Sequence, residues 1–214
     1  MTLRRLVLWR HGETDWNADR RMQGQLDAEL SVLGMEQARL AAPLIARFRP
    51  QALLTSDLRR ASNTAAILAE QTGLTVQTDK RLRETHLGEW QGLTHEDVDA
   101  RWPGGRASWR RNAEWAPPGG ETRVDVAGRA LQVVRELDGR PGIEVAVLCA
   151  HGGLIASLVA SLLGLPVDRW PALGGIGNCN WVVLDRPPPF EAAAQPCAST
   201  VAWRLTSYNA GVLG

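Results

Sequence analysis

Short apolar runs alternate along the chain with longer amphipathic stretches. The first run, Leu6–Trp9, ends at charged residues and glycine, which is typical of a strand buried on both faces of a parallel sheet. Comparable runs predict further strands at 52–55, 74–76, 145–149, 181–184 and 201–205. The pattern therefore predicts a sheet whose central strands are covered on both sides.

Apolar residues at helical spacing follow three of these runs. Ser31 is expected to cap a helix that continues to about Phe48 and stops before Pro50. A second helix is predicted over 57–70 before Gly73, and a third, rich in small residues, over 152–163. This alternation predicts an α/β fold, with helices on both faces of a mostly parallel sheet and a site at the carboxyl ends of its strands.

One segment interrupts the alternation. Residues 85–120 contain two Gly-Gly pairs, a Pro-Pro pair and four of the nine tryptophans, which favours a cap inserted into the fold. The whole chain has 214 residues, of which 44% are hydrophobic and 22% are charged, the balance of a globular protein with one core. We therefore expect a single domain over 1–214 with a cap insertion at about 85–120.

Charge and cysteine spacing exclude several kinds of partner. The formal charge of +1 gives no overall field toward nucleic acid or an anionic membrane, so any anion site must be local. Cys149, Cys179 and Cys197 lie far apart and form no C-x-x-C pair, so neither a zinc site nor a disulfide framework is indicated. The apolar run at 6–9 is too short for a signal peptide or a membrane span. We expect a cytoplasmic protein.

Two of the four histidines directly follow buried strands. Arg10 and His11 end the first strand, and His151 follows the strand at 145–149, so parallel strands would bring both imidazoles to the same edge of the sheet. His151 alone is equally compatible with a capping or hydrogen-bonded core residue. Together the two histidines favour phosphoryl chemistry, because a neutral imidazole attacks phosphorus while an adjacent arginine stabilises the phosphoryl oxygens.

An arginine and a carboxylate are candidates for the same site. Arg60, at the start of the second predicted helix, is preferred over Arg59 as a second phosphate ligand, although such arginines are usually solvated. Glu84 comes just before the cap, where a carboxyl group could protonate a leaving oxygen. Considered alone, Glu84 would be a surface acid.

Five motifs, in this order, resemble those of the histidine phosphatases of the phosphoglycerate mutase-like superfamily. They are Arg10-His11-Gly12-Glu13-Thr14-Asp15-Trp16-Asn17, the segment Ser56–Ala65, Glu84 with Gly88, Trp90 and Gly92, then Gly119-Gly120-Glu121, and His151-Gly152-Gly153. The resemblance spans nearly the whole chain. It implies the three-layer αβα fold of that superfamily and hydrolysis of a phosphomonoester.

The resemblance also implies the roles of individual residues. His11 would be the nucleophile that becomes phosphohistidine, Glu84 the proton donor, and Arg10, Arg60 and His151 the phosphate pocket. The substrate-binding residues that it implies are Arg10, Asn17, Gln23, Gly24, Arg60, Glu84, His151 and Gly152. Flanking arginines would keep His11 neutral and would replace a metal as charge stabiliser, so no metal or other cofactor is implied.

Two departures favour hydrolysis over mutase chemistry. Phosphoglycerate mutases usually carry an arginine soon after the His-Gly pair and a tyrosine-rich clamp, whereas this chain has Ala156 and a single tyrosine, Tyr208. The segment Gly88–His95 is also similar to the phosphatase version. A broad-specificity phosphatase and a phosphoglycerate mutase stay open as alternatives, as does a phosphoryl-binding scaffold without turnover.

Three stretches, 21–27, 81–88 and 170–175, resemble a group within this family, the glucosyl-3-phosphoglycerate phosphatases. The resemblance implies release of phosphate from glucosyl-3-phosphoglycerate to give glucosylglycerate, a precursor of methylglucose lipopolysaccharides, by a homodimer. The cap residues that could contact such a substrate are Trp90, Trp102, Trp109, Trp115, Arg106, Arg110 and Arg111, with core packing or solvent exposure as the alternative. A contact of His86 or His95 with substrate stays open, although a lone histidine in a cap is more often structural or solvated.

Overall fold

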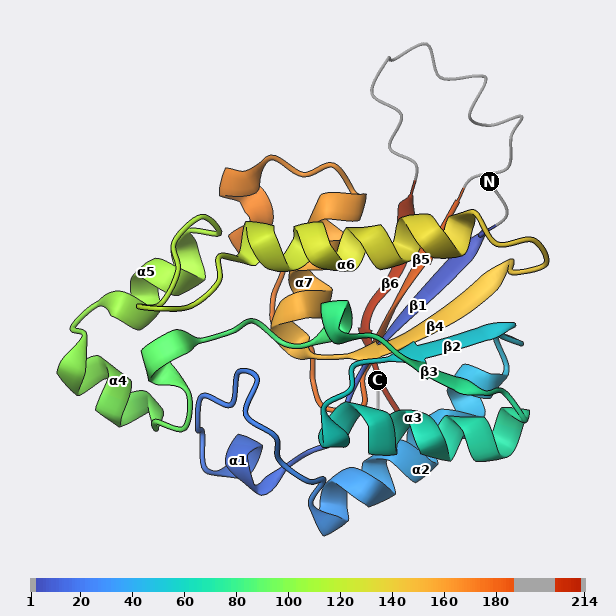
Figure 1. Ribbon diagram of the computed structural model, residues 1–214, viewed down its shortest axis with the longest axis horizontal. Helices are drawn as coiled ribbons and strands as arrows, with labels where there is room; N and C mark the ends of the chain where they lie inside the picture. The colour runs from blue at the N-terminus through green and yellow to red at the C-terminus, as the bar shows by residue number, and fades with distance from the viewer. Residues whose placement is uncertain (1–2, 187–202, 213–214) are drawn as a thin grey trace.

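The computed structural model describes residues 3–186 and 203–212, which form one six-stranded sheet flanked by helices (Figure 1). Its strands are β1 (Arg5–Arg10), β2 (Ala52–Thr55), β3 (Val76–Thr78), β4 (Val145–Ala150), β5 (Trp181–Asp185) and β6 (Arg204–Ala210), in the order β3-β2-β4-β1-β5-β6. The pairs β3–β2, β2–β4 and β4–β1 are parallel, whereas β5 and β6 are antiparallel to their neighbours. The expectation of a mostly parallel α/β sheet is confirmed.

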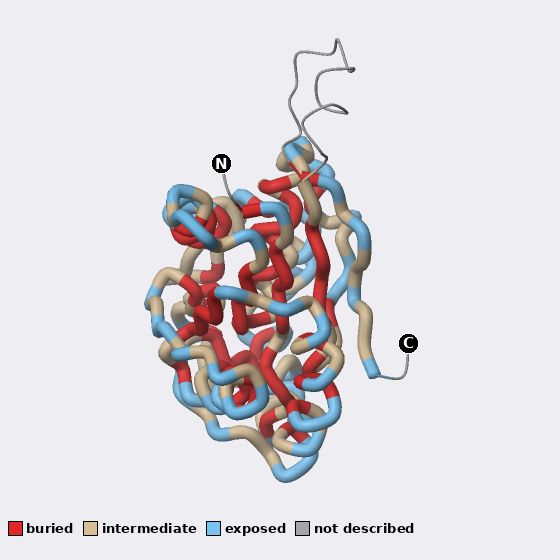
Figure 2. Tube along the Cα trace, turned by 90° about the vertical axis from the view of Figure 1, so that its right-hand side faces the viewer, coloured by how far each residue is buried: buried red, intermediate tan, exposed pale blue. Residues whose placement is uncertain are grey.

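The strand β1 buries both of its faces, as its continuous apolar sequence predicts. Leu6 and Leu8 belong to a core cluster shared with α6 and α7, and Val7 and Trp9 to a second cluster shared with α2 and α3. These helices are α2 (Val32–Ala46), α3 (Arg59–Thr72), α6 (Arg123–Asp138) and α7 (Gly152–Leu162). Figure 2 shows the buried trace running through the centre of the molecule between these layers.

Local signals explain where most of the predicted helices begin and end. Ser31 Oγ accepts a hydrogen bond from the Gly34 amide at 3.0 Å, as an N-cap does, and Gly73 ends α3 with a left-handed φ of 71°. The helix predicted over 57–70 begins two residues later, at Arg59. Its first amide donates to Asp27 Oδ1 at 2.8 Å, so a distant loop supplies the cap in place of a local side chain.

Three elements differ from the sequence prediction. The strand predicted to begin at Leu74 begins at Val76 and continues to Thr78. The last strand runs from Arg204 to Ala210 and not over 201–205, of which 201–202 lie outside the described residues. The helix α6 was not anticipated, although Thr122 and Asp125 form a capping box at its start. The segment 174–178 contains neither helix nor strand.

Short helices form the inserted segment and the connections near it. They are α1 (Asp15–Ala18), η1 (Lys80–Leu82), η2 (Gly88–Trp90), α4 (His95–Arg101), α5 (Gly105–Arg111) and η3 (Val167–Ala172). Under α4 and α5 lies a small separate core of Met22, Leu87, Trp90 and Val98, which we call the cap cluster. The fully buried Trp90 ring lies 5.5 to 6.2 Å from three other indoles, so aromatic packing organises this segment.

Candidate active site

The pairing of β1 with β4 brings the two strand-end histidines together. Arg10 is the register partner of Ala150, so His11 and His151 follow at the same edge of the sheet. Their ring centroids are 5.1 Å apart in an edge-to-face arrangement, and both side chains are buried. Strand spacing therefore sets the separation of the two imidazoles.

The His11 ring is held in one tautomer by its own loop. Nδ1 lies 2.6 Å from the carbonyl oxygen of Gly12, which can only accept, so Nδ1 carries the proton and donates. Burial lowers the pKa of His11 well below 6.5, and the positive charges of Arg60 and Arg10 lower that pKa further. The neutral ring therefore presents the lone pair of Nε2, which is the form that attacks phosphorus.

His151 is the N-cap residue of α7 and is completely buried. Neither of its ring nitrogens has a hydrogen-bond partner within the described part of the chain. Burial lowers its pKa well below 6.5, with Arg60, His11 and Arg10 adding to the effect in that order. A buried polar ring without a protein partner suits a ligand oxygen as its partner.

Two arginines, Arg10 and Arg60, place positive charge beside His11 in the pocket. Arg60 Nη1 and Nη2 donate to the carbonyls of Leu26 and Gly24 at 2.8 and 2.7 Å, and burial lowers the pKa of Arg60 to about 10. Arg10 Nη1 donates to Ile176 O at 2.5 Å, while Nε of each arginine is buried without a partner among the described residues. Such Nε–H groups are available to an anion, as the chemistry of a phosphate pocket requires. Arg59, in contrast, is exposed.

The Glu84 carboxylate lies at the N-terminus of α7. Its Oε2 accepts from the Gly153 amide and its Oε1 from the Leu154 amide, both at 3.0 Å, and the Thr85 amide donates to Oε1 at 2.7 Å. A Cβ on Gly153 would lie only 2.7 Å from Oε1, so this close approach requires glycine. The carboxylate is fixed in the pocket wall by backbone donors.

The remaining predicted substrate ligands are Asn17 on α1, Gln23 and Gly24 in the loop after it, and Gly152 at the start of α7. Asn17, Gln23 and Gly24 line the pocket, and Gln23 Nε2 donates to Thr14 Oγ1 at 2.8 Å. Gly152 does not line it; Gly153 does. The structure thus brings most of the predicted set to one pocket; His151 is not part of its lining and is buried beside the His11 ring.

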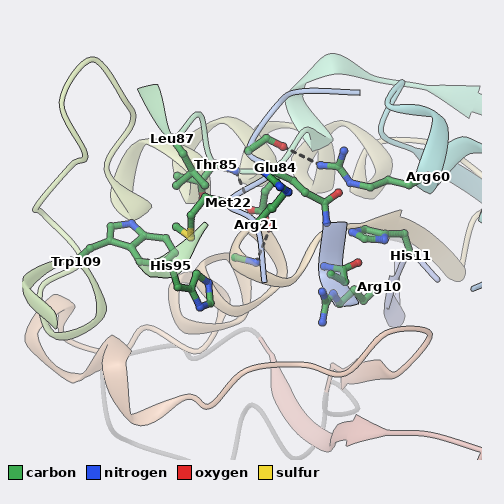
Figure 3. Close-up of a pocket in the computed structure, with 14 residues that line it drawn as sticks. Arg10, His11, Arg21, Met22, Arg60, Glu84, Thr85, Leu87, His95 and Trp109 are labelled. Atoms are coloured by element: carbon green, nitrogen blue, oxygen red, sulfur yellow. Dashed lines mark hydrogen bonds between the residues drawn. The ribbon is translucent and has the colours of Figure 1, made fainter. Parts of the chain in front are cut away.

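The pocket has a volume of about 200 Å³ and a second end that faces the cap. Figure 3 shows Arg10, His11 and Arg60 at one end and Trp109 and His95 at the other. This cap end is lined by Arg21, Met22, Leu87, His95 and Trp109. Arg21, Met22 and Leu87 were not predicted as site residues, and His95 was expected more often to be structural or solvated, because no local signal shows how the cap folds.

The other cap candidates lie elsewhere. Trp90 is core, whereas Trp102 and Trp115 pack against it and do not line the pocket. Arg106 forms an ion pair with Asp99, and neither Arg110 nor Arg111 lines the pocket. Within 3–186 and 203–212, no group of three or more His, Cys, Asp or Glu side chains could hold a metal ion. No helix of the described residues is long and apolar enough to cross a membrane.

Comparison with known proteins adds a family to this geometry. Residues 6–189 match the histidine phosphatase superfamily, branch 1. The chain belongs to this superfamily. The resemblance inferred from the five motifs is therefore confirmed, and the paired histidines of this histidine phosphatase lie where its parallel strands end.

Individual relatives of this histidine phosphatase are named for a single activity within the superfamily. A glucosyl-3-phosphoglycerate phosphatase from Mycolicibacterium vanbaalenii is 54% identical, over 98% of this chain and 96% of the relative. A mycobacterial glucosyl-3-phosphoglycerate phosphatase solved with VO3 has a TM-score of 0.88 and is 52% identical, covering 97% of this chain and 100% of that one. A complex of such an enzyme with inorganic phosphate has a TM-score of 0.87 at 51% identity, with 98% of each chain covered.

Proposed function

We propose that this histidine phosphatase hydrolyses glucosyl-3-phosphoglycerate to glucosylglycerate and phosphate through a phosphohistidine intermediate. The observation that carries the proposal is the identity of 54% to an enzyme of that name over 98% of the chain. The geometry supports it, because a neutral imidazole, two buried arginines and a carboxylate surround one pocket. Hydrolysis through a phosphohistidine uses a nucleophilic imidazole, cationic groups on the phosphoryl oxygens and an acid for the leaving oxygen.

In the first half-reaction, Nε2 of His11 attacks the phosphorus atom. A nitrogen–phosphorus bond forms as the bond from phosphorus to the ester oxygen breaks, and the protonated carboxyl of Glu84 gives its proton to that oxygen. The Nε–H groups of Arg10 and Arg60, which lack partners among the described residues, bind the phosphoryl oxygens. Their fixed charges stabilise the transition state without reorganising during the reaction.

In the second half-reaction, water attacks the phosphohistidine. The Glu84 carboxylate accepts a proton from the water, the nitrogen–phosphorus bond breaks, and His11 regains its lone pair. Inorganic phosphate leaves, and Glu84 is protonated for the next cycle. His151, buried 5.1 Å from the His11 ring, is available to bind a phosphoryl oxygen in both steps.

The cap end of the pocket suits the leaving group. Glucosylglycerate carries a sugar ring and a carboxylate, and the wall beyond the phosphate pocket contains the indole of Trp109 and the guanidinium of Arg21. An indole face packs against the apolar face of a sugar, and a guanidinium binds a carboxylate. This end therefore supports a glucosylated glycerate as the leaving group.

The test is phosphate release by the purified protein in EDTA, with glucosyl-3-phosphoglycerate, 3-phosphoglycerate, phenyl phosphate and other sugar phosphates. We expect the highest kcat/KM for the glucosylated substrate. Equal kcat/KM across the panel would refute this substrate and indicate a broad-specificity phosphatase. Isomerisation without net phosphate release would indicate a mutase, and phosphate binding without turnover a scaffold.

Two tryptophan variants test the cap end. Trp109→Ala should lower kcat/KM for glucosyl-3-phosphoglycerate about tenfold, while phenyl phosphate changes less, because the lost contact is to the sugar. Trp115→Ala is the matched control, since Trp115 packs in the same aromatic group but does not line the pocket. Equal losses on both substrates in Trp109→Ala would contradict a sugar site here.

The resemblance to related enzymes also supports a cytoplasmic homodimer. Val32, Leu33 and Leu40 expose 89%, 49% and 55% of their surfaces on α2, which is apolar area that a second copy could cover. Cys149 and Cys179 are buried free thiols, which is compatible with a reducing compartment. Light scattering of the purified protein tests the oligomeric state, and a monomeric mass would refute the dimer.

A further inference from the structure

An ion pair lies beside the segment that carries Glu84, outside the pocket lining. Arg129, on α6, donates from Nε and Nη2 to the two carboxylate oxygens of Glu121, both at 3.1 Å. The Arg129 and Glu121 side chains are only 18% and 27% exposed, so neither is a freely solvated surface charge. Neither residue lines the pocket, so the reaction described above gives them no part.

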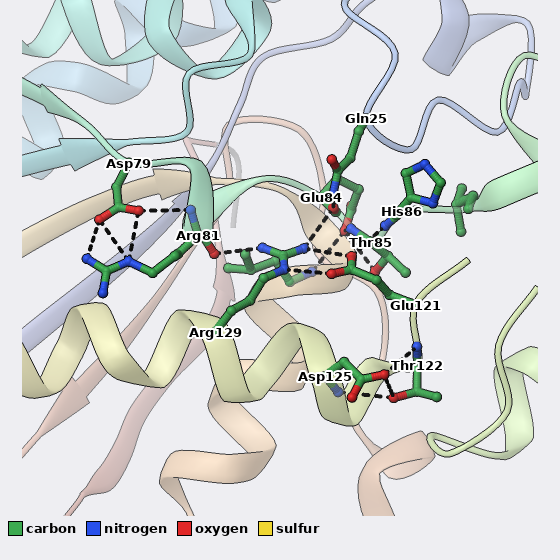
Figure 4. Close-up of polar contacts among 12 residues, drawn as sticks. Gln25, Asp79, Arg81, Glu84, Thr85, His86, Glu121, Thr122, Asp125 and Arg129 are labelled. Carbon is green, nitrogen blue, oxygen red and sulfur yellow. Dashed lines mark hydrogen bonds and ion pairs between the residues drawn. The ribbon is translucent and has the colours of Figure 1, made fainter. Parts of the chain in front are cut away.

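The Glu121 and Arg129 side chains form hydrogen bonds with the backbone before and after Glu84 (Figure 4). Arg129 Nη1 donates to the carbonyl of Arg81 at 2.6 Å, and Nη2 donates to the carbonyl of Glu84 itself at 2.9 Å. Glu121 Oε2 accepts from the His86 amide at 2.8 Å, and the Glu121 amide donates to the His86 carbonyl at 2.8 Å. These two side chains hold the backbone from residue 81 to residue 86, together with Gln25 Nε2, which donates to the Glu84 carbonyl at 3.0 Å.

The Glu84 side chain is fixed separately, by a different helix. Its carboxylate accepts the Gly153 and Leu154 amides at the N-terminus of α7. The position of the reactive oxygens therefore depends on α7 through the carboxylate and on α6 through the backbone. Glu84 lies between η1 and η2, outside any helix or strand, so its backbone depends on side-chain hydrogen bonds such as that of Arg129.

We propose that the Glu121–Arg129 ion pair positions Glu84 for proton transfer to the leaving oxygen, an inference that rests on the proposed function. Proton transfer needs donor and acceptor oxygens within hydrogen-bond distance, so a small displacement of the backbone lowers the rate steeply. The four charge-assisted hydrogen bonds of Arg129 are directional, and lysine, with a single ammonium, satisfies fewer of them. Arg129 and Glu121 act through Glu84 and do not contact the substrate.

The dependence on the leaving group distinguishes positioning from general structural support. Phenyl phosphate has a basic leaving oxygen that needs a proton, whereas the anion from dinitrophenyl phosphate leaves without one. In Arg129→Lys and in Glu121→Gln, kcat/KM for phenyl phosphate should fall by about 10- to 100-fold, because part of the general-acid contribution is lost. For dinitrophenyl phosphate it should change by less than about threefold, since no proton transfer assists that step.

Arg186→Lys is the matched control. Arg186 pairs with Asp138 at 2.6 Å, with side chains 16% and 14% exposed, and lies beside Leu3 at the opposite end of β1 from the site. Its substitution should lower stability and leave the ratio of the two kcat/KM values unchanged. In a Glu84→Gln background, Arg129→Lys should cause no further loss on phenyl phosphate, because both changes affect one step.

Equal losses on the two esters in both variants, or no loss on phenyl phosphate, would overturn the positioning role. If Arg129→Lys does not fold, Glu121→Gln still decides, because its amide oxygen can accept from the His86 backbone while the ion pair is lost. Failure of the wild-type protein to release phosphate from either ester and from glucosyl-3-phosphoglycerate would refute the proposed function, and this inference with it. A wild type that cleaves both esters but shows no preference for glucosyl-3-phosphoglycerate would refute the substrate alone.

Discussion

Replacing Gly153 by alanine should separate activity from stability. The residue lies in the first turn of α7 with an ordinary helical conformation, so alanine meets no backbone strain there. The added Cβ would lie 2.7 Å from Glu84 Oε1 and 3.2 Å from Thr85 Oγ1. The Glu84 oxygen must then move by about 0.7 Å to reach the 3.4 Å of an ordinary contact.

The size of the expected effect follows from that displacement. A misplacement of about 1 Å in a reacting group costs about 10²-fold, so 0.7 Å should lower kcat/KM for an alkyl phosphate by about 10- to 100-fold. Stability should change little, because alanine gains up to about 1 kcal/mol over glycine in a helix while the contact with Glu84 removes part of that gain. The loss of activity would therefore occur in a folded protein.

The assay pairs phosphate release with urea denaturation. Gly128→Ala is the matched control, because a Cβ at Gly128 on α6 meets nothing within 4 Å. This control should gain up to about 1 kcal/mol of unfolding free energy and keep the wild-type kcat/KM. Unchanged kcat/KM in Gly153→Ala would refute the conclusion that the Glu84 oxygens are held in contact with this turn.

Three further expectations concern the phosphoryl end of the pocket. His11→Ala should lower phosphate release at least about 10³-fold and remove the acid-labile phosphoprotein, because no other residue is proposed to attack phosphorus; retained turnover would contradict that role. Arg60→Lys should lower kcat/KM about 10²-fold, since one ammonium group is unable to bind the Leu26 and Gly24 carbonyls and a phosphoryl oxygen at once. A wild-type kcat/KM in this variant would show that the guanidinium group is not needed. Burial lowers the pKa of both His11 and His151 in the folded state, so below about pH 6.5 only the unfolded chain takes up these protons. The unfolding free energy should therefore fall as the pH drops below about 6.5, by up to about 1.4 kcal/mol per pH unit for each histidine, and a flat urea midpoint between pH 7 and 5 would refute it.

The positions of Arg10 and His11 were predictable because the end of a strand buried on both faces can be recognised from the sequence. The apolar run stops, and the next side chains must lie at the carboxyl edge of the sheet. His151 follows from the same argument on β4. For these residues, local sequence and position in the fold carry the same information.

Contacts between distant segments were not predictable in this way. The cap of α3 comes from Asp27, and the pocket wall includes Trp109 and His95, so each depends on how two separate segments meet. The hydrogen bond from Arg129 to the Glu84 carbonyl likewise joins two segments that lie far apart in the sequence. The capping box of Thr122 and Asp125 was a local signal for α6, but it says nothing about which backbone α6 will hold.

The cap cluster of Met22, Leu87, Trp90 and Val98 is separate from the two cores that flank the sheet. Two of its members, Met22 and Leu87, also face the pocket. Substitutions there would change the wall around the leaving group, whereas the residues proposed to bind or attack the phosphoryl group lie on or beside β1, α3 and α7. Phosphoryl chemistry and recognition of the leaving group therefore depend on different parts of the fold. Repacking the cap cluster can change which leaving group fits while the phosphoryl-binding residues keep their positions.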